Sequence, residues 1–168
     1  MVIRFFDLLF ATIALVCFSP VLIIIALFIL FESKGGSFYK QLRVGKDNKD
    51  FYLLKFRTMR VGADKKGLLT VGDRDPRVTR SGFFLRKYKL DELPQLVNVF
   101  VGDMSIVGPR PEVRRYVDLY SDHQKRILHV KPGITDYASF NYIDENEILA
   151  QSTDPEYTYI HEIMPAKI

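Results

Sequence analysis

The chain has 168 residues, of which 48% are hydrophobic and 13% aromatic, enough apolar material for one domain with a sizeable core. A single cysteine, Cys17, excludes a disulfide framework and a cysteine-based metal site. The net charge of +4 is unevenly distributed, because residues 32–66 contain ten Lys or Arg against four Asp or Glu. Beside an apolar segment, such a basic stretch suits anionic lipid headgroups or a polyphosphate ligand.

The first predicted element is an uncharged run of 24 residues from Leu8 to Phe31. As a straight helix it would extend about 36 Å, which exceeds the roughly 30 Å hydrocarbon core of a bilayer. No small-x-small cleavage site follows the run before Glu32, which argues against a cleavable signal peptide. We therefore expect a membrane-associated helix.

Ser19 and Pro20 divide this run into two arms of 12 residues each. Pro20 removes a backbone donor and presses against the carbonyl of Val16, and the Ser19 hydroxyl can donate to a carbonyl freed in this way. Two arrangements remain open from these residues: a kinked helix that spans the bilayer, and a bent helix that re-enters on the side it left. The basic residues that follow Lys34 favour a cytoplasmic location for the rest of the chain.

A break at residues 33–36 separates a membrane part, residues 1–34, from a predicted cytosolic domain, residues 35–168. Residues 51–61 have the composition of a strand, and alternation would place Lys55 and Arg57 on one face. A long Gly- and Asp-rich connection follows at residues 61–82, where a functional role is suspected because long loops are uncommon.

The remaining pattern is mostly helical, which predicts a helix-rich α+β fold with amphipathic helices. One helix is expected from an N-cap at Ser81 to about Phe100, either kinked or divided in two at Pro94. Its apolar stripe would consist of Leu85, Leu93, Leu96, Val97 and Phe100. Further expected elements are an amphipathic helix at 111–128, a turn at 131–133, and a last short helix that begins at Asp154-Pro155 and ends at Pro165.

Two adjacent acids, Asp91 and Glu92, are the strongest candidates for chemistry. Neighbouring side chains on a helix point about 100° apart, so these carboxylates would divide the work: one attacks phosphorus while the other binds a divalent cation. Arg86 and other nearby cations would attract an anionic substrate. An ordinary surface pair between Lys87 and Asp91 is the alternative.

Arg110 lies between two prolines, Pro109 and Pro111, which leave its backbone little freedom. A rigid guanidinium suits bidentate phosphate binding, although a plain turn explains the same residues. The chain contains no G-x-x-x-x-G-K-[ST] loop, no dinucleotide-binding glycine pattern and no H-E-x-x-H motif, and its three histidines are scattered. These classes of site are therefore not predicted.

Several stretches together resemble the bacterial sugar transferases: Ser-Pro in the apolar run, "KFRTM" at 55–59, "LDELPQLVNVFVGDMSIVGPRPE" at 90–112 and "KPGIT" at 131–135. More narrowly, the chain resembles the small monotopic polyprenyl-phosphate phosphoglycosyl transferases of the type that begins N-linked glycan assembly. Relatives usually continue beyond a position equivalent to Ile168, so a short natural form or a truncated chain is expected.

The resemblance implies a re-entrant helix bent at Ser19-Pro20, at the cytoplasmic face of the bacterial inner membrane. It also implies transfer of a sugar 1-phosphate from a UDP-sugar to undecaprenyl phosphate, with UMP released and Mg²⁺ as cofactor. By motif, Asp91 would be the nucleophile that forms an aspartyl phosphosugar, and Glu92 its partner at the metal. The predicted phosphate-binding residues are Arg86, Arg110, Lys55 and Arg57.

A rival hypothesis is a non-enzymatic membrane-anchored module that binds anionic lipid or polyphosphate. Its binding surface would consist of Lys40, Arg43, Lys46, Lys55 and Arg57. We expect no nucleic-acid partner on either hypothesis. The sugar and the oligomeric state are left open.

Overall fold

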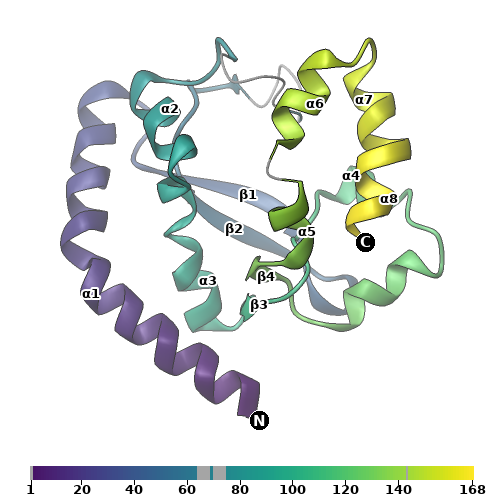
Figure 1. Cartoon of the computed structure of the whole chain (residues 1–168). Coiled ribbons are helices and arrows are strands. Elements are labelled where there is room, and N and C mark those ends of the chain that lie inside the picture. The colour runs from purple at the N-terminus through teal and green to yellow at the C-terminus, as the bar shows by residue number, and fades with distance from the viewer. Residues whose placement is uncertain (1, 64–68, 70–74, 143) are drawn as a thin grey trace.

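The protein is a helix-rich α+β structure, as expected (Figure 1). Helix α1, Val2–Glu32, runs along one side, and the antiparallel hairpin of β1, Phe38–Val44, and β2, Asp50–Phe56, crosses the middle. The C-terminal helices cover the side opposite α1. The computed structural model describes residues 2–63, 69, 75–142 and 144–168.

The other elements are short. A 3-10 turn, Lys46–Asn48, joins the two strands of the hairpin. The second sheet pairs β3, Ser105–Val107, in parallel with β4, Gly133–Thr135. The remaining helical elements are α2 Arg80–Lys87, η3 Leu90–Glu92, α3 Gln95–Val101, α4 Arg114–Val117, η4 Gln124–His129, α5 Tyr137–Asn141, α6 Glu145–Gln151, α7 Pro155–Thr158, η5 Tyr159–Ile163 and α8 Met164–Lys167.

Helix α1 changes direction part-way along its length (Figure 1). Pro20 lies inside the helix, and the Ser19 hydroxyl donates to the carbonyl oxygen of Val16 at 2.8 Å. This carbonyl is the one that proline leaves without its usual partner, because a helical amide donates to the residue four positions earlier. The predicted back-bonding of Ser19 is therefore confirmed.

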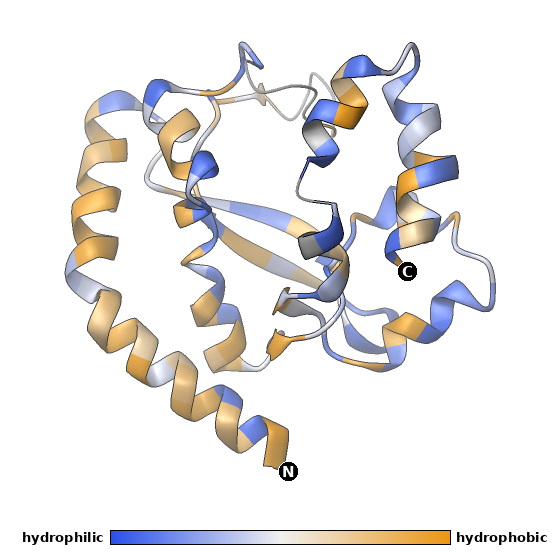
Figure 2. Cartoon of the chain, in the orientation of Figure 1, coloured by the Kyte–Doolittle hydropathy of each residue, from blue (hydrophilic) through white to orange (hydrophobic). Residues whose placement is uncertain are grey.

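Helix α1 is long and apolar enough to cross a membrane by length and composition. Ala11 and Ile29 are buried against the rest of the protein, whereas most of its large apolar side chains are exposed. Figure 2 shows this apolar character continuing along α1 and onto α3. A soluble protein would not leave so large a contiguous apolar surface in water, so α1 is suited to lipid.

The N-terminal end of α1 is tied to the globular part of the chain. Arg4 donates to the carbonyl oxygens of Val99 and Phe100, at 2.6 and 2.8 Å, where α3 ends. The Asp7 carboxylate is buried and accepts hydrogen bonds from the Ser105 hydroxyl and the Ile106 amide, at 2.9 and 3.0 Å. Arg4 thus provides a partner for carbonyl groups at the end of α3, and Asp7 provides one for an amide within β3.

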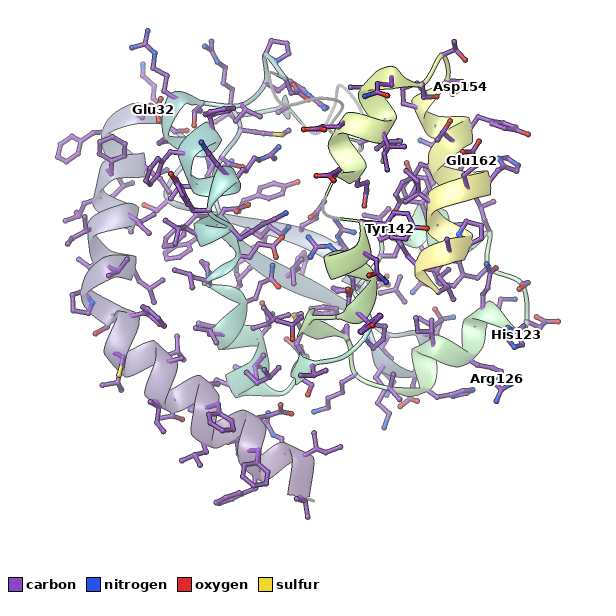
Figure 3. The ribbon with its side chains drawn as sticks, in the orientation of Figure 1. Glu32, His123, Arg126, Tyr142, Asp154 and Glu162 are labelled. Carbon is purple, nitrogen blue, oxygen red and sulfur yellow. The ribbon has the colours of Figure 1, made fainter. Side chains whose placement is uncertain are left out.

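The C-terminal end of α1 is tied to the same body at a different place. The Glu32 carboxylate accepts from the amides of Arg80 and Ser81, at 2.9 and 3.1 Å, and from the Ser81 hydroxyl. A carboxylate at a helix N-terminus satisfies free amides and opposes the positive end of the helix dipole. Figure 3 shows Glu32 at the end of α1 beside the start of α2. Both ends of the apolar helix thus contact one globular unit.

Some sequence predictions need correction. The N-cap of α2 is Thr79, whose hydroxyl accepts from the Gly82 amide at 3.0 Å, because Ser81 is used to bind Glu32 instead. The continuous helix expected at 111–128 is absent: only α4 and the 3-10 segment η4 form there. Pro165 does not end the last helix: the chain stays helical from α7 through η5 to α8, and Pro165 directly follows the π-helical turn η5 and Met164.

Other predictions are confirmed or refined. Two separate helices meet near Pro94, which was one of the two alternatives, and Asp154 caps α7 by accepting from the Tyr157 amide at 3.0 Å. Of the expected apolar stripe, Leu85 and Leu96 are buried, but Val97 and Phe100 are exposed. The connection predicted at 61–82 includes residues 64–68 and 70–74, which lie outside the described residues.

Candidate active site

A tight turn between α2 and α3 presents the two acids. Helix α2 ends at Lys87, and Lys89 then adopts a left-handed conformation with φ 56°. A left-handed residue other than glycine carries strain, and such residues concentrate at functional sites. The chain reverses there into η3, so that Asp91 and Glu92 lie between two helices that both pack beside α1.

Glu92 is held by two cations. Its Oε1 atom lies 3.1 Å from Lys55 Nζ and 2.6 Å from Arg110 Nη2, and its Oε2 atom lies 3.4 Å from Arg110 Nη1. Burial by itself would raise the pKa of Glu92, but Lys55 and Arg110 together hold that pKa well below its usual value. Glu92 is therefore an anion at neutral pH and gathers both cations at one point.

Asp91 has a different environment. It is 6% exposed, and its Oδ1 atom is buried without a hydrogen-bond partner. Burial raises the pKa of Asp91, against the opposing attraction of Lys55. Buried polar atoms are almost always hydrogen-bonded, so an oxygen without a partner points to a ligand or a reaction. The two adjacent carboxylates thus have opposite pKa shifts, which is a common arrangement in catalytic sites.

Lys55 reaches the site from β2. Its side chain is 17% exposed, and burial lowers its pKa to about 8, although the charge of Glu92 opposes this shift. Leu53, on the same face of the strand, is buried against α1 and α3 together with Ala11 and Val99. One face of the strand therefore contacts the core through Leu53 and places Lys55 beside the acids.

Arg110 is supplied by the segment between β3 and α4, in which Pro109 and Pro111 flank it. Its guanidinium is 35% exposed and forms the two contacts to Glu92. Burial would lower the pKa of Arg110, but the carboxylate of Glu92 raises it, so the side chain is a permanent cation. Arg110 thus combines a fixed backbone with an accessible charged group.

Arg86 and Arg57 differ in their placement. Arg86 donates to the Thr58 hydroxyl at 2.9 Å, and burial lowers its pKa while the nearby charge of Asp91 opposes this. Arg57, which strand alternation placed beside Lys55, binds the carbonyl oxygens of Gly36 and Phe38 instead, at 2.9 and 3.1 Å. Arg57 nevertheless lies on the face of the hairpin that carries Lys55, since its guanidinium is 5.7 Å from the ring of Tyr39, the cross-strand partner of Lys55. The predicted common face is therefore confirmed, but Arg57 is held by backbone carbonyls and Lys55 by Glu92.

The acids suit a hard cation such as Mg²⁺. Mg²⁺ commonly binds through one or two carboxylates together with substrate phosphate and water, so two protein ligands are sufficient. Asp91 Oδ1 is available, and Glu92 Oε2 has only the long contact to Arg110. Among the described residues no cluster of three or more His, Cys, Asp or Glu side chains could hold a metal. Residues and ion fit one another if the substrate supplies the remaining ligands.

Several functional residues were not predicted from the sequence. Lys89 was predicted only as one of the cations near the acids, and its left-handed backbone conformation is visible only in the structure. Arg4, Asp7 and Glu32 flank the apolar run and were not predicted to bind specific partners, although charged residues so close to lipid indicate such partners. The basic surface of the rival hypothesis is also divided: Arg43 pairs with Glu112 and Lys55 with Glu92, while Lys40 and Lys46 are exposed.

Comparison with known proteins identifies the family of the chain. The family model for bacterial sugar transferases matches residues 1–166. The chain belongs to the bacterial sugar transferase family. Among its relatives is the UDP-N-acetylgalactosamine-undecaprenyl-phosphate N-acetylgalactosaminephosphotransferase of Aeromonas hydrophila, 44% identical over 138 residues, which cover 80% of this chain and 33% of the relative.

Two further relatives are similar to a comparable degree. The uncharacterized sugar transferase EpsL of Bacillus subtilis is 43% identical over 82% of this chain and 67% of its own length. The UDP-glucose:undecaprenyl-phosphate glucose-1-phosphate transferase of Escherichia coli is 40% identical over 93% of this chain and 35% of its own length. The chain therefore spans about one third to two thirds of the length of these relatives.

Proposed function

We propose that the protein is a polyprenyl-phosphate phosphoglycosyl transferase, which moves a sugar 1-phosphate from a UDP-sugar to undecaprenyl phosphate. Family membership and the names of the relatives support this general reaction. The observation that carries the proposal is the pairing of a buried carboxylate oxygen without a partner, on Asp91, with a neighbouring Glu92 that holds Lys55 and Arg110. The names of relatives differ in the sugar, so the sugar is left to experiment.

The proposed reaction has two balanced steps. An Asp91 carboxylate oxygen attacks the phosphorus that carries the sugar, a P–O bond forms, and the bond from that phosphorus to the bridging oxygen breaks. UMP leaves with that oxygen. In the second step an oxygen of the polyprenyl phosphate attacks the same phosphorus, and the Asp91 carboxylate leaves, which yields the polyprenyl-diphosphate sugar. Division into two steps lets a water-soluble donor and a lipid acceptor use one site in turn.

The other residues hold and neutralise the diphosphate. Lys55 and Arg110 already converge on one carboxylate, so incoming phosphate oxygens can replace Glu92 as their partner. Desolvation of Asp91 removes water that would otherwise have to be displaced before attack. We propose Asp91 and Glu92 as the Mg²⁺ ligands; when bound, the ion would supply further neutralisation of phosphate charge. Arg86 provides additional positive charge beside Asp91.

We also propose that α1 re-enters the membrane on the cytoplasmic side instead of spanning it. The helix is bent, and its two ends bind the same globular unit through Arg4, Asp7 and Glu32. A spanning helix would place these ends on opposite sides of the bilayer, where one globular unit could not contact both. Exposed apolar side chains of α2 and α3, among them Phe84 and Phe100, would extend the lipid contact.

The decisive experiment is a screen of UDP-sugars for UMP release, with undecaprenyl phosphate and Mg²⁺ supplied to purified protein in nanodiscs. Asp91→Asn is expected to fold but to release no UMP, whereas Asp122→Asn, which removes a fully exposed carboxylate elsewhere, is expected to behave as wild type. With donor labelled in the sugar phosphate and no acceptor, label is expected to remain on the wild-type protein. Turnover by Asp91→Asn near the wild-type rate would remove the assigned nucleophile.

A further inference from the structure

The segment that carries Arg110 is fastened through a glutamate two residues later. Glu112 accepts hydrogen bonds from Arg43 Nη1 at 2.9 Å, from the Val113 amide at 2.7 Å, and from the hydroxyl of Tyr159. Its side chain is 16% exposed. A carboxylate that accepts from three donors in a largely buried position is held firmly, because each of its contacts is charge-assisted.

Backbone contacts fix the rest of the segment. Arg43 Nη1 also donates to the Pro111 carbonyl at 3.1 Å, and the Val44 amide donates to the Glu112 carbonyl at 2.9 Å. On the other side of Arg110, the Gly133 amide donates to the Pro109 carbonyl at 3.0 Å. The position of Arg110 is therefore set by β1 and β4 together with Glu112.

Tyr159 brings the C-terminal helices into this arrangement. It begins the π-helical turn η5, and its ring packs 4.9 Å from that of Tyr116 within the core cluster shared by β1, α4 and the C-terminal helices. Isolated π-helical turns are rare and occur frequently at functional sites. A cavity of only about 40 Å³ lies between the Arg110 segment and these helices. Movement of the helices would therefore be transmitted to the segment.

Arg110 has alternative partners if this support weakens. The carboxylates of Asp136 and Glu145 are near enough to raise its pKa, after Glu92 and against the effect of burial. Burial likewise raises the pKa of Tyr159, and Glu112 adds to this shift, so the hydroxyl stays protonated and donates at all physiological pH values.

We propose that Tyr159 is a positioning residue for donor binding: through Glu112 its hydroxyl holds Arg110 in reach of the donor diphosphate, and so couples the C-terminal helices to the active site. Tyr159 touches no reacting atom in this proposal. The inference rests on the proposed function, since it assigns Arg110 to the donor phosphates.

The test is a double-mutant cycle on donor binding in the Asp91→Asn protein, which separates binding from turnover. The probe is the UDP-sugar that gives UMP release with the wild type. Tyr159→Phe removes only the hydroxyl and is expected to raise the donor Kd roughly five- to tenfold when Arg110 is present. In the Arg110→Ala background the same substitution is expected to change the Kd by less than about twofold, because the two residues act through one contact.

Tyr116→Phe is the matched control, because it removes a hydroxyl from the adjacent ring, and the hydrogen bond to Glu112 comes from Tyr159. The donor Kd of this variant is expected to be unchanged. Equal weakening by Tyr159→Phe in both backgrounds, or no weakening in either, would overturn the inference. If Tyr159→Phe does not fold, Glu112→Gln is placed in the same cycle and judged by the same two outcomes. Failure of the proposed function is a separate result: the wild type would release no UMP from any UDP-sugar.

Discussion

Replacement of Asp7 tests the membrane arrangement through protein stability. The Ser105 hydroxyl and the Ile106 amide both donate to the same oxygen, Asp7 Oδ1, and Asp7 and Ser105 are 4% and 6% exposed. Asp7→Ala leaves two donors without a partner, each at a cost of about 1–3 kcal/mol, so the free energy of unfolding should fall by about 2–6 kcal/mol. Asp7→Asn retains an oxygen acceptor and should lose about 1 kcal/mol.

For a chain of this length, 1 kcal/mol corresponds to roughly 2–4 °C in Tm, so Asp7→Ala should melt at least about 4 °C below wild type. The chain has nine tyrosines and no tryptophan, so near-UV circular dichroism of protein in nanodiscs follows the loss of tertiary structure. Thr12→Ala is the control, because the Thr12 hydroxyl bonds only within α1. An unchanged Tm for Asp7→Ala would mean that the N-terminal end of α1 is not docked, and the re-entrant proposal would lose its main support.

Four further predictions concern the site and the segments beside it. Because burial lowers the pKa of Lys55 to about 8, kcat/KM for the donor is expected to fall as pH rises through about 8. Lys55→Arg should move this fall to higher pH, since arginine stays charged. An unchanged pH profile in Lys55→Arg would show that Lys55 does not cause the fall. The free energy of unfolding should also rise with pH between about 8 and about 10.4, the pKa of Lys55 in the unfolded chain. In this range the unfolded chain binds more protons than the folded one, and denaturation at each pH measures the effect. Gly82→Ala should cost about 1–3 kcal/mol in thermal unfolding, since the new Cβ would lie 2.1 Å from the carbonyl oxygen of Thr58. Lys89→Gly should raise Tm slightly or leave it unchanged, since glycine accepts φ 56° without strain; a large loss of Tm would contradict this.

The candidate residues of the site could be named from the sequence because each stands in a local motif. Asp91 and Glu92 are adjacent, and Arg110 is marked by its flanking prolines. Alternation placed Arg57 on the face that carries Lys55, but it could not show that Arg57 binds the carbonyl oxygens of Gly36 and Phe38 and not the acids. Mg²⁺ binding and the roles assigned to these residues stay predictions.

Contacts that join distant parts of the chain could not be predicted from the sequence. Tyr159 lies 47 positions from Glu112, and Arg4 lies 95 positions from Val99, so neither pair leaves a local pattern. The helix expected at 111–128 is a related case: its apolar residues recur at helical spacing, but the segment instead divides into α4 and η4. Tertiary packing overrides local propensity in such segments.

The sequence by itself determined the membrane-associated helix, its bend and the identity of the acids, because each depends on residues that are neighbours in the chain. The helix follows from an uncharged run, and its bend from a proline and the carbonyl four residues before it. The acids are an adjacent pair of carboxylates. The tertiary structure decided how the two acids differ, because the pKa of a carboxylate depends on the charges and solvent around it. Lys55 and Arg110 come to Glu92 from 37 and 18 residues away and leave Asp91 Oδ1 without a partner. Folding alone creates that difference.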